Sequence, residues 1–435
     1  MFSDYRNKKV TVIGLGRSGL AAADLLKWLG ATVFISEKAD NDRFRALRDD
    51  LGNKGIRVEI GRHTIDFIRG KDLVVVSPGV GSDSESLIWA DELHIPVISE
   101  IELASSVCPA TVIAITGTNG KTTVTTLIAK ILQTRDVRAF ALGNIGAPFS
   151  AYVRDMEGAD YVSLEVSSFQ LERIDIFKPR VAVILNFTPD HLDKEHRGYN
   201  SMSEYLAAKK RIFMNQDESD YLVLNEDDPA VKSLAKETKS KAIFFSAKRT
   251  AHNACLPDRQ AQRSLNPNHL AAMAVASIFG ISEDVCLEFF RNFKGVEHRL
   301  EQVRTVGGVE FINDSKATNV DSTIWALESI RKPAILIAGG RDKNLDYNVI
   351  TDLVKEKVKM LILIGEAKEK MGKAFRGVLP IQEASSLEEA VEAGYRKAAE
   401  GDCVLLSPMC ASFDMFTDYE HRGRCFKEIV NRLKD

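Results

Sequence analysis

Short apolar runs rich in β-branched residues alternate with longer amphipathic stretches along almost the whole chain. Examples of the apolar runs are "VTVIG" (10–14), "TVIAIT" (111–116) and "CVLLS" (403–407). This alternation is typical of parallel sheets that carry helices on both faces. The runs are too many for one sheet, so the pattern predicts an α/β protein of three domains.

Two positions divide the chain. A fresh strand with its own glycine loop starts soon after "HIPVIS", which places the first boundary near Ser99. A predicted helix pair (266–293) precedes a strand pair joined by a Gly307–Gly308 turn, which places the second boundary near Val296. The predicted domains are residues 1–99, 100–296 and 297–435.

Composition narrows the class of partner. The 435-residue chain is 45% hydrophobic and carries a net charge of -3, which argues against a nucleic-acid or anionic-membrane surface. The N-terminus lacks a signal-peptide apolar stretch, and no apolar run is long enough to cross a bilayer, so we expect a cytoplasmic protein. The cysteines show no C-x-x-C pair and no zinc spacing, which predicts free thiols. They are Cys108, Cys255, Cys286, Cys403, Cys410 and Cys425.

A first glycine loop follows the first predicted strand. Gly14, Gly16 and Gly19 form G-x-G-x-x-G between a strand and a helix, and the next strand ends at Glu37. This is the pattern of a dinucleotide-binding, Rossmann-like fold, in which backbone amides approach a pyrophosphate. A nicotinamide-dependent dehydrogenase is one interpretation, but it gives no role to the second glycine loop.

That second loop is "GTNGKTT" at residues 117–123, between the strand "TVIAIT" and a helix. Its amides are suited to phosphate oxygens, Lys121 can reach the β and γ phosphates, and the hydroxyl of Thr122 or Thr123 can hold Mg²⁺. The spacing departs from the general P-loop, because Ile115 stands where its first glycine belongs. We expect an ATP site; a non-catalytic P-loop regulatory module is an alternative class.

Acids and histidines that could complete a metal site follow two further strands. Glu165 lies in the apolar run "YVSLEVSS", where an unpaired carboxylate would be costly to bury. It either completes the metal site or forms a salt bridge. The other candidates lie just beyond the strand "VAVILNF", and His191 has the best position among them. They are Asp190, His191, Asp193 and His196.

These motifs carry a family resemblance. "GTNGKTT", "LEVSSFQL", "NFTPDHLD" and "YLAAKKRIF", in that order, resemble the ATP-binding domain of the Mur ligases, which form amide bonds in peptidoglycan precursor synthesis. Folylpolyglutamate synthases share this plan. "HRLE" (298–301), "INDSKATN" (312–319), "AGGRDK" (338–343) and the block 407–423 are similar to the branch that adds D-glutamate. Another Mur ligase or a folylpolyglutamate synthase is the alternative.

The resemblance implies a fold and a reaction. It implies a Rossmann-like N-terminal domain that binds the UDP part of the substrate, a central P-loop ATPase domain with a parallel sheet, and a Rossmann-like C-terminal domain that binds the amino acid. The implied reaction joins D-glutamate to UDP-N-acetylmuramoyl-L-alanine through an acyl phosphate, with ATP and two Mg²⁺ sites. The implied state is a monomer with no nucleic-acid or membrane partner.

The resemblance also assigns the ATP and metal residues. Thr122 and Glu165 would hold the first metal ion, His191 the second, and Lys209, once carbamylated, would be an anionic metal ligand. The implied catalytic residues are Lys121, Glu165, His191 and Lys209. The implied nucleotide contacts are Gly117, Thr118, Asn119, Gly120, Lys121, Thr122, Thr123, Asn268 (adenine), Arg299 (phosphate) and Asp314 (ribose).

The remaining assignments concern the two substrates to be joined. For the UDP substrate the implied contacts are Arg17, Ser18, Glu37, Ser77, Gly79 and Asn144. For D-glutamate, whose two carboxylates require cations and hydroxyls, they are Lys316, Thr318, Lys343, Ser412 and Tyr419.

Each of several residues has a plainer structural interpretation. Lys209 can be a solvent-facing lysine of a predicted helix, and Lys210 points about 100° away around that helix, so only one of the two can face a given site. Asp314 can be a helix or turn cap, and Ser412 and Tyr419 can be cap or core residues.

Overall fold

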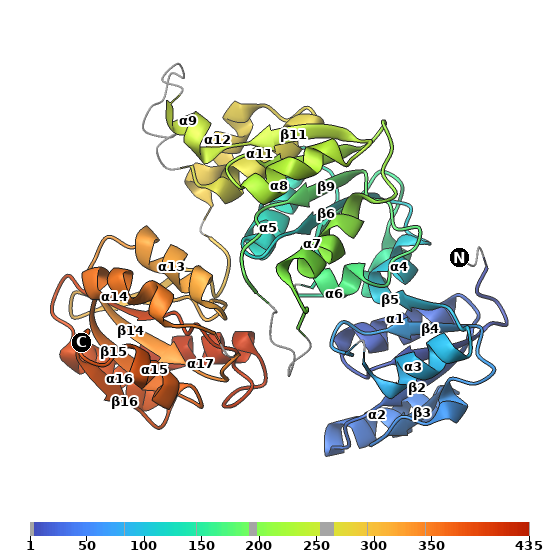
Figure 1. Cartoon of the computed structure of the whole chain (residues 1–435), viewed down its shortest axis with the longest axis horizontal. Helices are drawn as coiled ribbons and strands as arrows, with labels where there is room; N and C mark the ends of the chain where they lie inside the picture. Colours follow the sequence, from blue (N-terminus) through green and yellow to red (C-terminus); the bar gives the residue numbers. More distant parts are fainter. Residues whose placement is uncertain are drawn as a thin grey trace. The chain divides into compact units, whose positions relative to one another are not determined.

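The protein is represented by a computed structural model that describes residues 4–81, 83–144, 146–190, 198–252, 265–293, 295–343 and 345–434, without the side chains of 250–252. The chain forms two compact units, Met1–Asn292 and Phe293–Asp435. The first unit contains two parallel sheets and the second contains one mixed sheet, so the predicted three-domain α/β fold is confirmed (Figure 1). The predicted boundaries at residues 99 and 296 stay predictions.

The N-terminal sheet has five parallel strands in the order β3-β2-β1-β4-β5. Its strands are β1 (Lys9–Ile13), β2 (Thr32–Glu37), β3 (Arg57–Ile60), β4 (Leu73–Val76) and β5 (Val97–Ser99). Its helices are α1 (Arg17–Trp28), α2 (Asp42–Asn53), the 3₁₀ turn η1 (Ile65–Phe67), α3 (Glu85–Glu92) and α4 (Glu100–Ser105). The strand order reverses between β1 and β4, and ligands of such sheets bind outside the carboxyl ends at that point.

The middle sheet has six parallel strands in the order β11-β10-β9-β6-β8-β7. They are β6 (Thr111–Thr116), β7 (Ala139–Gly143), β8 (Tyr161–Glu165), β9 (Val181–Ile184), β10 (Tyr221–Asn225) and β11 (Lys241–Phe245). The α-helices are α5 (Lys121–Gln133), α6 (Ser168–Leu171), α7 (Met202–Lys210), α8 (Pro229–Ser233), α9 (Ala247–His252), α11 (Pro267–Ile278) and α12 (Glu283–Asn292). The 3₁₀ turns are η2 (Phe149–Ala151), η3 (Val153–Asp155), η5 (Arg211–Phe213) and η6 (Leu234–Lys236).

The second unit contains a six-stranded sheet in the order β12-β13-β17-β14-β15-β16, with β12 antiparallel to β13 and the other pairs parallel. The strands are β12 (Glu301–Val306), β13 (Val309–Asn313), β14 (Ala334–Gly339), β15 (Val358–Ile364), β16 (Ile381–Glu383) and β17 (Cys403–Leu406). The helices are α13 (Val320–Ser329), the 3₁₀ turn η7 (Asn348–Ile350), α14 (Thr351–Lys357), α15 (Lys368–Ala374), α16 (Leu387–Lys397) and α17 (Tyr419–Arg432). The hairpin turn between β12 and β13 is Gly307–Gly308, as predicted.

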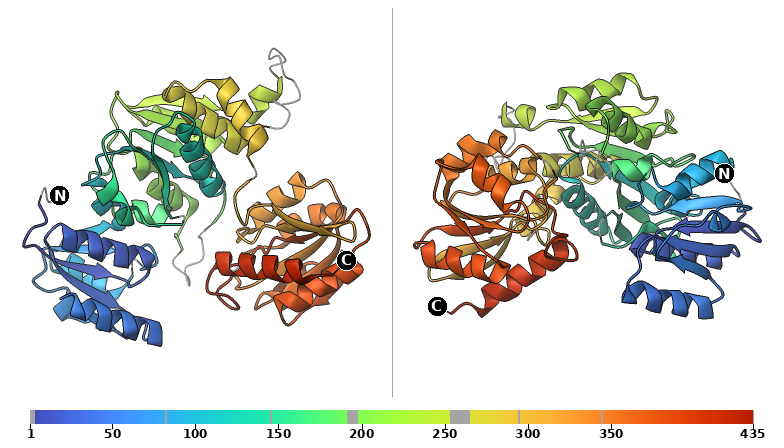
Figure 2. Two further views of the ribbon diagram at one scale, coloured as in Figure 1. Left: turned by 180° about the vertical axis from the view of Figure 1, so that it is seen from behind. Right: turned by 60° about the horizontal axis from the view of Figure 1, so that its bottom comes forward.

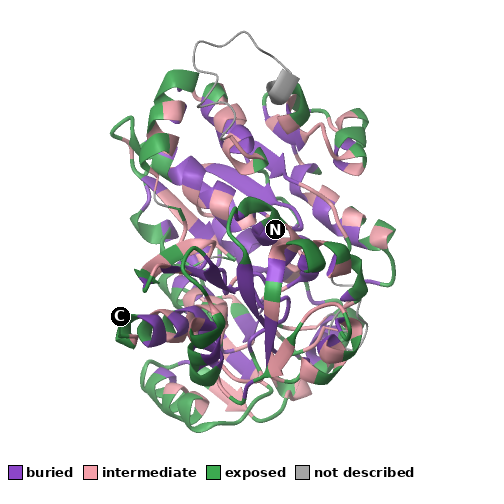
Figure 3. Cartoon of the chain, turned by 90° about the vertical axis from the view of Figure 1, so that its left-hand side faces the viewer, coloured by how far each residue is buried: buried purple, intermediate pink, exposed green. Residues whose placement is uncertain are grey.

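Helices cover both faces of these sheets, and the central strands are buried (Figures 2 and 3). In the first unit one continuous buried cluster joins the two sheet domains, since it includes Leu25 and Ile101 from one and Phe149 and Val153 from the other. Five cysteines are free thiols, and Cys255 lies outside the described residues. Among the described residues no helix is long and apolar enough to cross a membrane.

Helix α4 connects the N-terminal sheet to the middle domain and buries two carboxyl groups. Glu102 accepts the backbone N–H groups of Asp175, Ile176 and Phe177 at 2.8–3.0 Å. Glu100, 1% exposed, accepts the N–H of Ser150 at 2.6 Å. Burial raises the pKa of Glu100, and the Ser150 hydrogen bond opposes that rise only in part.

The buried carboxyl group of Glu100 makes stability depend on pH. Since its pKa is raised on folding, the folded chain holds its proton more tightly than the unfolded chain, and stability is lost as pH rises through the raised pKa. We expect Glu100→Gln to lessen the loss of unfolding free energy as pH rises above 4.5, the ordinary pKa of a glutamate; one proton can contribute at most about 1.4 kcal/mol per pH unit. Parallel thermal-melt curves for variant and wild type would contradict this.

Candidate active site

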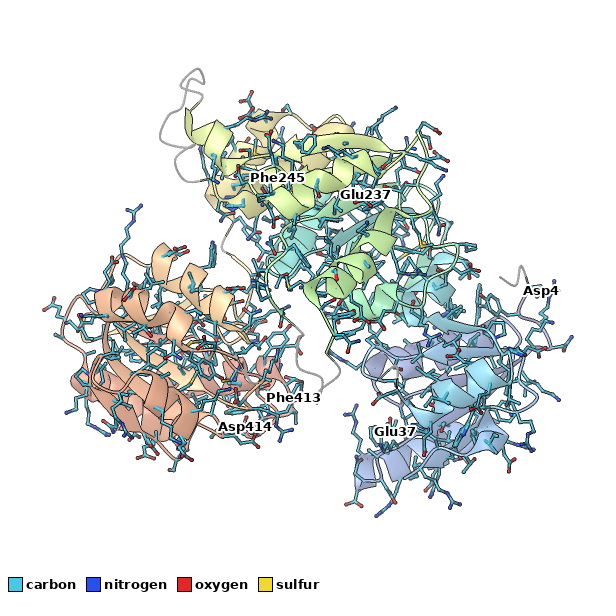
Figure 4. The ribbon with its side chains drawn as sticks, viewed as in Figure 1. Asp4, Glu37, Glu237, Phe245, Phe413 and Asp414 are labelled. Carbon is cyan, nitrogen blue, oxygen red and sulfur yellow. The ribbon has the colours of Figure 1, made fainter. Side chains whose placement is uncertain are left out.

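The first glycine loop lies at the carboxyl end of β1, where the strand order of the N-terminal sheet reverses. A Cβ at Gly19 would lie 2.0 Å from the carbonyl oxygen of Gly14, so no larger residue fits there. Glu37, labelled in Figure 4, accepts the N–H groups of Leu15 at 2.7 Å and Ala39 at 2.8 Å. The acid at the end of β2 therefore holds the loop in place as well as facing its cavity.

A cavity of about 810 Å³ opens beside this loop, between the N-terminal sheet and the β7 end of the middle sheet. All six residues predicted for the UDP substrate line it: Arg17, Ser18, Glu37, Ser77, Gly79 and Asn144. Arg17 also donates to the carbonyl of Gly146 at 3.0 Å, so the loop touches the middle domain.

Basic side chains that the sequence did not single out also line this cavity. They include Arg62 and His63, next to Lys38. His63 shares a hydrogen bond with the hydroxyl of Ser36 at 2.6 Å, and burial lowers the pKa of the imidazole. Arg17, Lys38 and Arg62 thus give this cavity cationic groups that can pair with an anionic ligand.

The second glycine loop follows β6 and leads into α5, as predicted. Lys121 donates to the carbonyl oxygens of Gly117 at 2.9 Å and Thr118 at 2.7 Å. Gly120 has φ +84°, and a Cβ there would lie 2.4 Å from Oδ1 of Asn268. Asn268, on α11, for which the resemblance implies an adenine contact, therefore lies directly against the loop.

Asn186, just beyond β9, fastens this loop. Its side-chain carbonyl accepts the N–H of Asn119 at 2.8 Å, and its side-chain amide donates to the carbonyl of Asn119 at 3.0 Å. The N–H of Thr118 donates to the backbone carbonyl of Asn186 at 3.1 Å. The hydroxyl of Thr118 accepts the N–H of Thr188 and donates to its carbonyl, both at 3.1 Å. These bonds engage the N–H groups of Thr118 and Asn119 within the protein, whereas the first turn of a helix such as α5 is a general site for anions.

Glu165 ends β8, where it pairs in register with Ile115 of β6. The carboxyl group is 2% exposed, and its two oxygens accept from the Thr122 hydroxyl at 2.7 Å and the Asn144 amide at 3.2 Å. A hydroxyl and a carboxylate that touch beside a phosphate loop are the hard oxygen donors that Mg²⁺ prefers. These residues fit a magnesium ion.

Lys209, on α7, is almost fully buried at 1% exposure. Its Nζ donates to the carbonyl of Gly117 at 2.9 Å and lies 4.4 Å from the ring centre of Tyr205. Burial, and then the charge of Lys121, lower the pKa of this amine well below its usual value, while Asp190 acts against them. The buried site therefore favours the neutral amine over the charged ammonium.

The solvent-facing interpretation of Lys209 is wrong, and the geometric argument about its neighbour is confirmed. Lys210 points elsewhere and forms an ion pair with Glu237. A second cavity of about 300 Å³ contains Lys209 and Lys121 and shares Pro78, Gly79 and Asn144 with the first cavity. Asp190 is buried, whereas His191, Asp193 and His196 lie outside the described residues.

In the second unit, Asp314 follows β13 and is 4% exposed. Its carboxylate accepts the Ser407 hydroxyl at 2.9 Å and the N–H of Leu300 at 3.3 Å. Burial raises the pKa of Asp314 to about 7, and the neighbouring Arg299 opposes the rise. Of the helix-cap and turn-cap interpretations, the helix cap is wrong, because Asn319 caps the next helix, α13. Arg299 and Asp314, both predicted nucleotide contacts, are brought together.

The residues predicted for the amino acid gather at the carboxyl edge of the same sheet. Lys316 follows β13 and lies 4.8 Å from the ring centre of Tyr419, the first residue of α17. Thr318 donates its N–H to the carbonyl of Lys316 at 2.9 Å. Lys343 and Ser412 follow β14 and β17, which are neighbours in the sheet. Beyond Ser412 the chain exposes Phe413 (Figure 4).

Arg422, on α17, connects the loop that follows β13 to the loop that follows β17. It is 1% exposed and donates to the hydroxyl and the carbonyl of Ser315 at 3.0 and 2.8 Å. It also donates to the carbonyls of Cys410 at 3.2 Å and Ala411 at 3.4 Å. Burial lowers its pKa to about 10, so the guanidinium stays charged at neutral pH.

Asn186 and Arg422 were missed from the sequence, although each left a signal. Asn186 was counted within the predicted strand "VAVILNF", whereas β9 ends at Ile184, so the rule that selected residues beyond the strand end began too late in the chain. Arg422 interrupts the buried stripe of α17 that includes Phe426 and Val430. A charge within such a stripe indicates a buried polar network.

The chain matches three family models. They are the Mur ligase MurD-like N-terminal domain over residues 8–99, the Mur ligase middle domain over 115–279, and the Mur ligase glutamate ligase domain over 298–410. Together with the two glycine loops and their cavities, these matches define an amide ligase of the Mur type, and the chain belongs to the Mur ligase family.

Within that family, two relatives that match the chain over almost its full length share one name. The chain is 42% identical over 99% of its length to "UDP-N-acetylmuramoylalanine--D-glutamate ligase" of Koribacter versatilis, covering 99% of that protein. It is also 42% identical to the protein of this name from Geotalea uraniireducens, over 99% of this chain and 98% of the relative.

Solved structures share the fold. The chain resembles a type C pseudomurein peptide ligase from Methanothermus fervidus (TM-score 0.58, 20% identity, 98% of this chain and 100% of that one). It also resembles the MurF ligase of Thermotoga maritima in complex with ADP (TM-score 0.57, 18% identity, 98% of this chain and 96% of that one). Enzymes of this family are ATP-dependent ligases.

The Asn186 contacts generate a prediction about ATP. We expect Asn186→Ala to raise the KM for ATP about tenfold, because the loop that presents α5 loses two of its hydrogen bonds. Steady-state kinetics with varied ATP would measure this. Asn215→Ala is the matched control, since Asn215 donates to two loop carbonyls, those of Asp175 and Phe177. Equal KM values for the two variants would contradict the prediction.

Proposed function

We propose that the chain catalyses the ATP-dependent addition of D-glutamate to UDP-N-acetylmuramoyl-L-alanine. The observation that carries the proposal is that the cavity beside the first glycine loop and the cavity of the phosphate loop share Pro78, Gly79 and Asn144. A ligand whose diphosphate lies against the first loop can therefore extend its acyl end towards Lys121 and Lys209. The name of the full-length relatives supports D-glutamate as the acceptor.

The reaction begins with transfer of the γ-phosphoryl group of ATP to the substrate carboxylate, which activates it as an acyl phosphate. Lys121 and the first turn of α5 draw negative charge from the transferred group. Thr122 and Glu165 would hold Mg²⁺, which neutralises phosphate charge when bound. A second Mg²⁺ at His191 rests on the sequence resemblance alone.

Lys209 has the properties that carbamylation requires. Carbamylation joins the nitrogen lone pair of a neutral amine to the carbon of CO₂ and releases one proton, and the lowered pKa of Lys209 favours the neutral amine that this step needs. The product is an anion beside Lys121, where it would add an oxygen ligand for a metal ion.

The second unit supplies the acceptor site in this proposal. Lys316 and Lys343 pair with the carboxylates of D-glutamate, and Thr318, Ser412 and Tyr419 supply hydrogen bonds. The neutral amine of D-glutamate attacks the acyl carbon of the acyl phosphate. The bond from that carbon to the phosphate oxygen then breaks, phosphate leaves with the electron pair, and the nitrogen loses a proton to give the amide. Arg299 and Asp314 contact the ATP phosphate and ribose. A cytoplasmic location and a monomeric state remain predictions.

The first test measures phosphate release from Mg²⁺ and ATP with UDP-N-acetylmuramoyl-L-alanine and one amino acid at a time. We expect release and a new amide only with D-glutamate, and neither with L-glutamate, L-alanine, L-lysine or diaminopimelate. Release with a different acceptor would assign the chain to another Mur reaction. If none of these amino acids causes phosphate release, folate-type substrates become the favoured alternative.

The buried amine generates a second prediction. We expect Lys209→Ala to lower kcat at least about a hundredfold, because a metal ligand is lost, whereas Lys210→Ala stays near wild type. Intact-protein mass spectrometry under bicarbonate should show the added mass of one CO₂ on wild type and Lys210→Ala only. The same added mass on Lys209→Ala would contradict this assignment.

A further inference from the structure

Asn144 is the first residue beyond β7, and two hydrogen bonds join it to Glu165. Its side-chain amide donates to Oε1 of the carboxylate at 3.2 Å, and its backbone N–H donates to the Glu165 carbonyl at 2.9 Å. The register of the strands explains both contacts, because Gly143 pairs with Glu165 across β7 and β8. The backbone bond holds Asn144 in place whether or not a ligand is present.

Each oxygen of the Glu165 carboxylate therefore accepts a hydrogen bond. The hydroxyl of Thr122 donates to Oε2 at 2.7 Å, and the side-chain amide of Asn144 donates to Oε1. A carboxylate held at one oxygen alone can rotate about its last side-chain bond, whereas one held at both presents fixed lone pairs. Removal of a residue that hydrogen-bonds to a metal ligand commonly lowers metal affinity by about tenfold to a hundredfold.

Asn144 also faces both cavities. It is exposed, unlike Glu165, and it lines the cavity beside the first glycine loop as well as the one that contains Lys209. The Asn side-chain amide has two hydrogens and a carbonyl oxygen. One hydrogen serves Glu165, which leaves the second hydrogen and the oxygen for a ligand between the two cavities.

We propose that Asn144 is a positioning residue for the metal-site carboxylate, in addition to its role as a substrate contact. The inference rests on the proposed function, in which Glu165 is a magnesium ligand. Through Asn144 the site for the acyl end of the UDP substrate and the site for Mg²⁺ share one side chain. Binding at the two sites is then coupled, and the coupling is reciprocal.

The experiment measures Mg²⁺ binding in the absence of the UDP substrate. The affinity of the full chain for a non-hydrolysable ATP analogue is determined by calorimetry with and without Mg²⁺, and the ratio of the two affinities reports the metal site. We expect Asn144→Ala to reduce this ratio about tenfold and to leave the metal-free affinity unchanged. A ratio equal to that of wild type would overturn the proposal, since a pure substrate contact has no effect when substrate is absent.

Two further variants show the route of the effect. Arg62 also lines the first cavity, but it belongs to the N-terminal sheet domain. We therefore expect Arg62→Ala to keep the wild-type ratio of affinities. In a Glu165→Gln background, Asn144→Ala should reduce the ratio little further, because the carboxylate it positions is gone. An equal reduction in both backgrounds would show that Asn144 does not act through Glu165.

The result of this calorimetry experiment can be distinguished from the result of the phosphate-release test with D-glutamate. Loss of the Mg²⁺ effect in Asn144→Ala together with no D-glutamate ligation by wild type would leave the positioning role standing and overturn the acceptor assignment. Normal ligation by wild type with an unchanged ratio in Asn144→Ala would overturn the positioning role alone.

Discussion

The register of β8 between β6 and β7 is the constraint on which the first unit's site depends. Glu165 pairs with Ile115 on one side and Gly143 on the other, so its carboxylate meets the phosphate loop and Asn144 together. Side chains alternate between sheet faces along a strand, and a slip of one residue would turn Glu165 to the opposite face. Burial of the apolar neighbours Val162 and Leu164 fixes the register of β8, and the register in turn fixes the sheet face on which the Glu165 carboxylate lies.

The same rule builds each of the other sites. In parallel sheets the carboxyl ends of neighbouring strands lie at one edge, and the loops beyond those ends gather there whatever their distance in sequence. Gly14 and Ser77 meet in this way beyond β1 and β4. Asp314 and Ser407 meet beyond β13 and β17. Three sheets with different strand orders therefore each gather a set of loops at their carboxyl edge.

The sequence predicted the fold class, both glycine loops and the positions that line the first cavity, because glycine spacing and strand ends are local signals. It left open whether Lys209 faces solvent, since helical spacing shows only that Lys209 and Lys210 diverge. It missed the contacts of Asn186 with Asn119, because those residues are far apart in the chain and only the pairing of β9 with β6 brings them together. The four bonds of Arg422 depend on loop conformations that no local pattern encodes.

The buried cluster that joins the two sheet domains of the first unit has a further consequence. Because Leu25 and Ile101 pack in one core with Phe149 and Val153, the walls of the 810 Å³ cavity stand in place before any ligand arrives. A rigid inhibitor shaped to that cavity would lose little of its binding free energy to ordering the protein. Its affinity would then be governed by how well it replaces the water around Arg17 and Arg62.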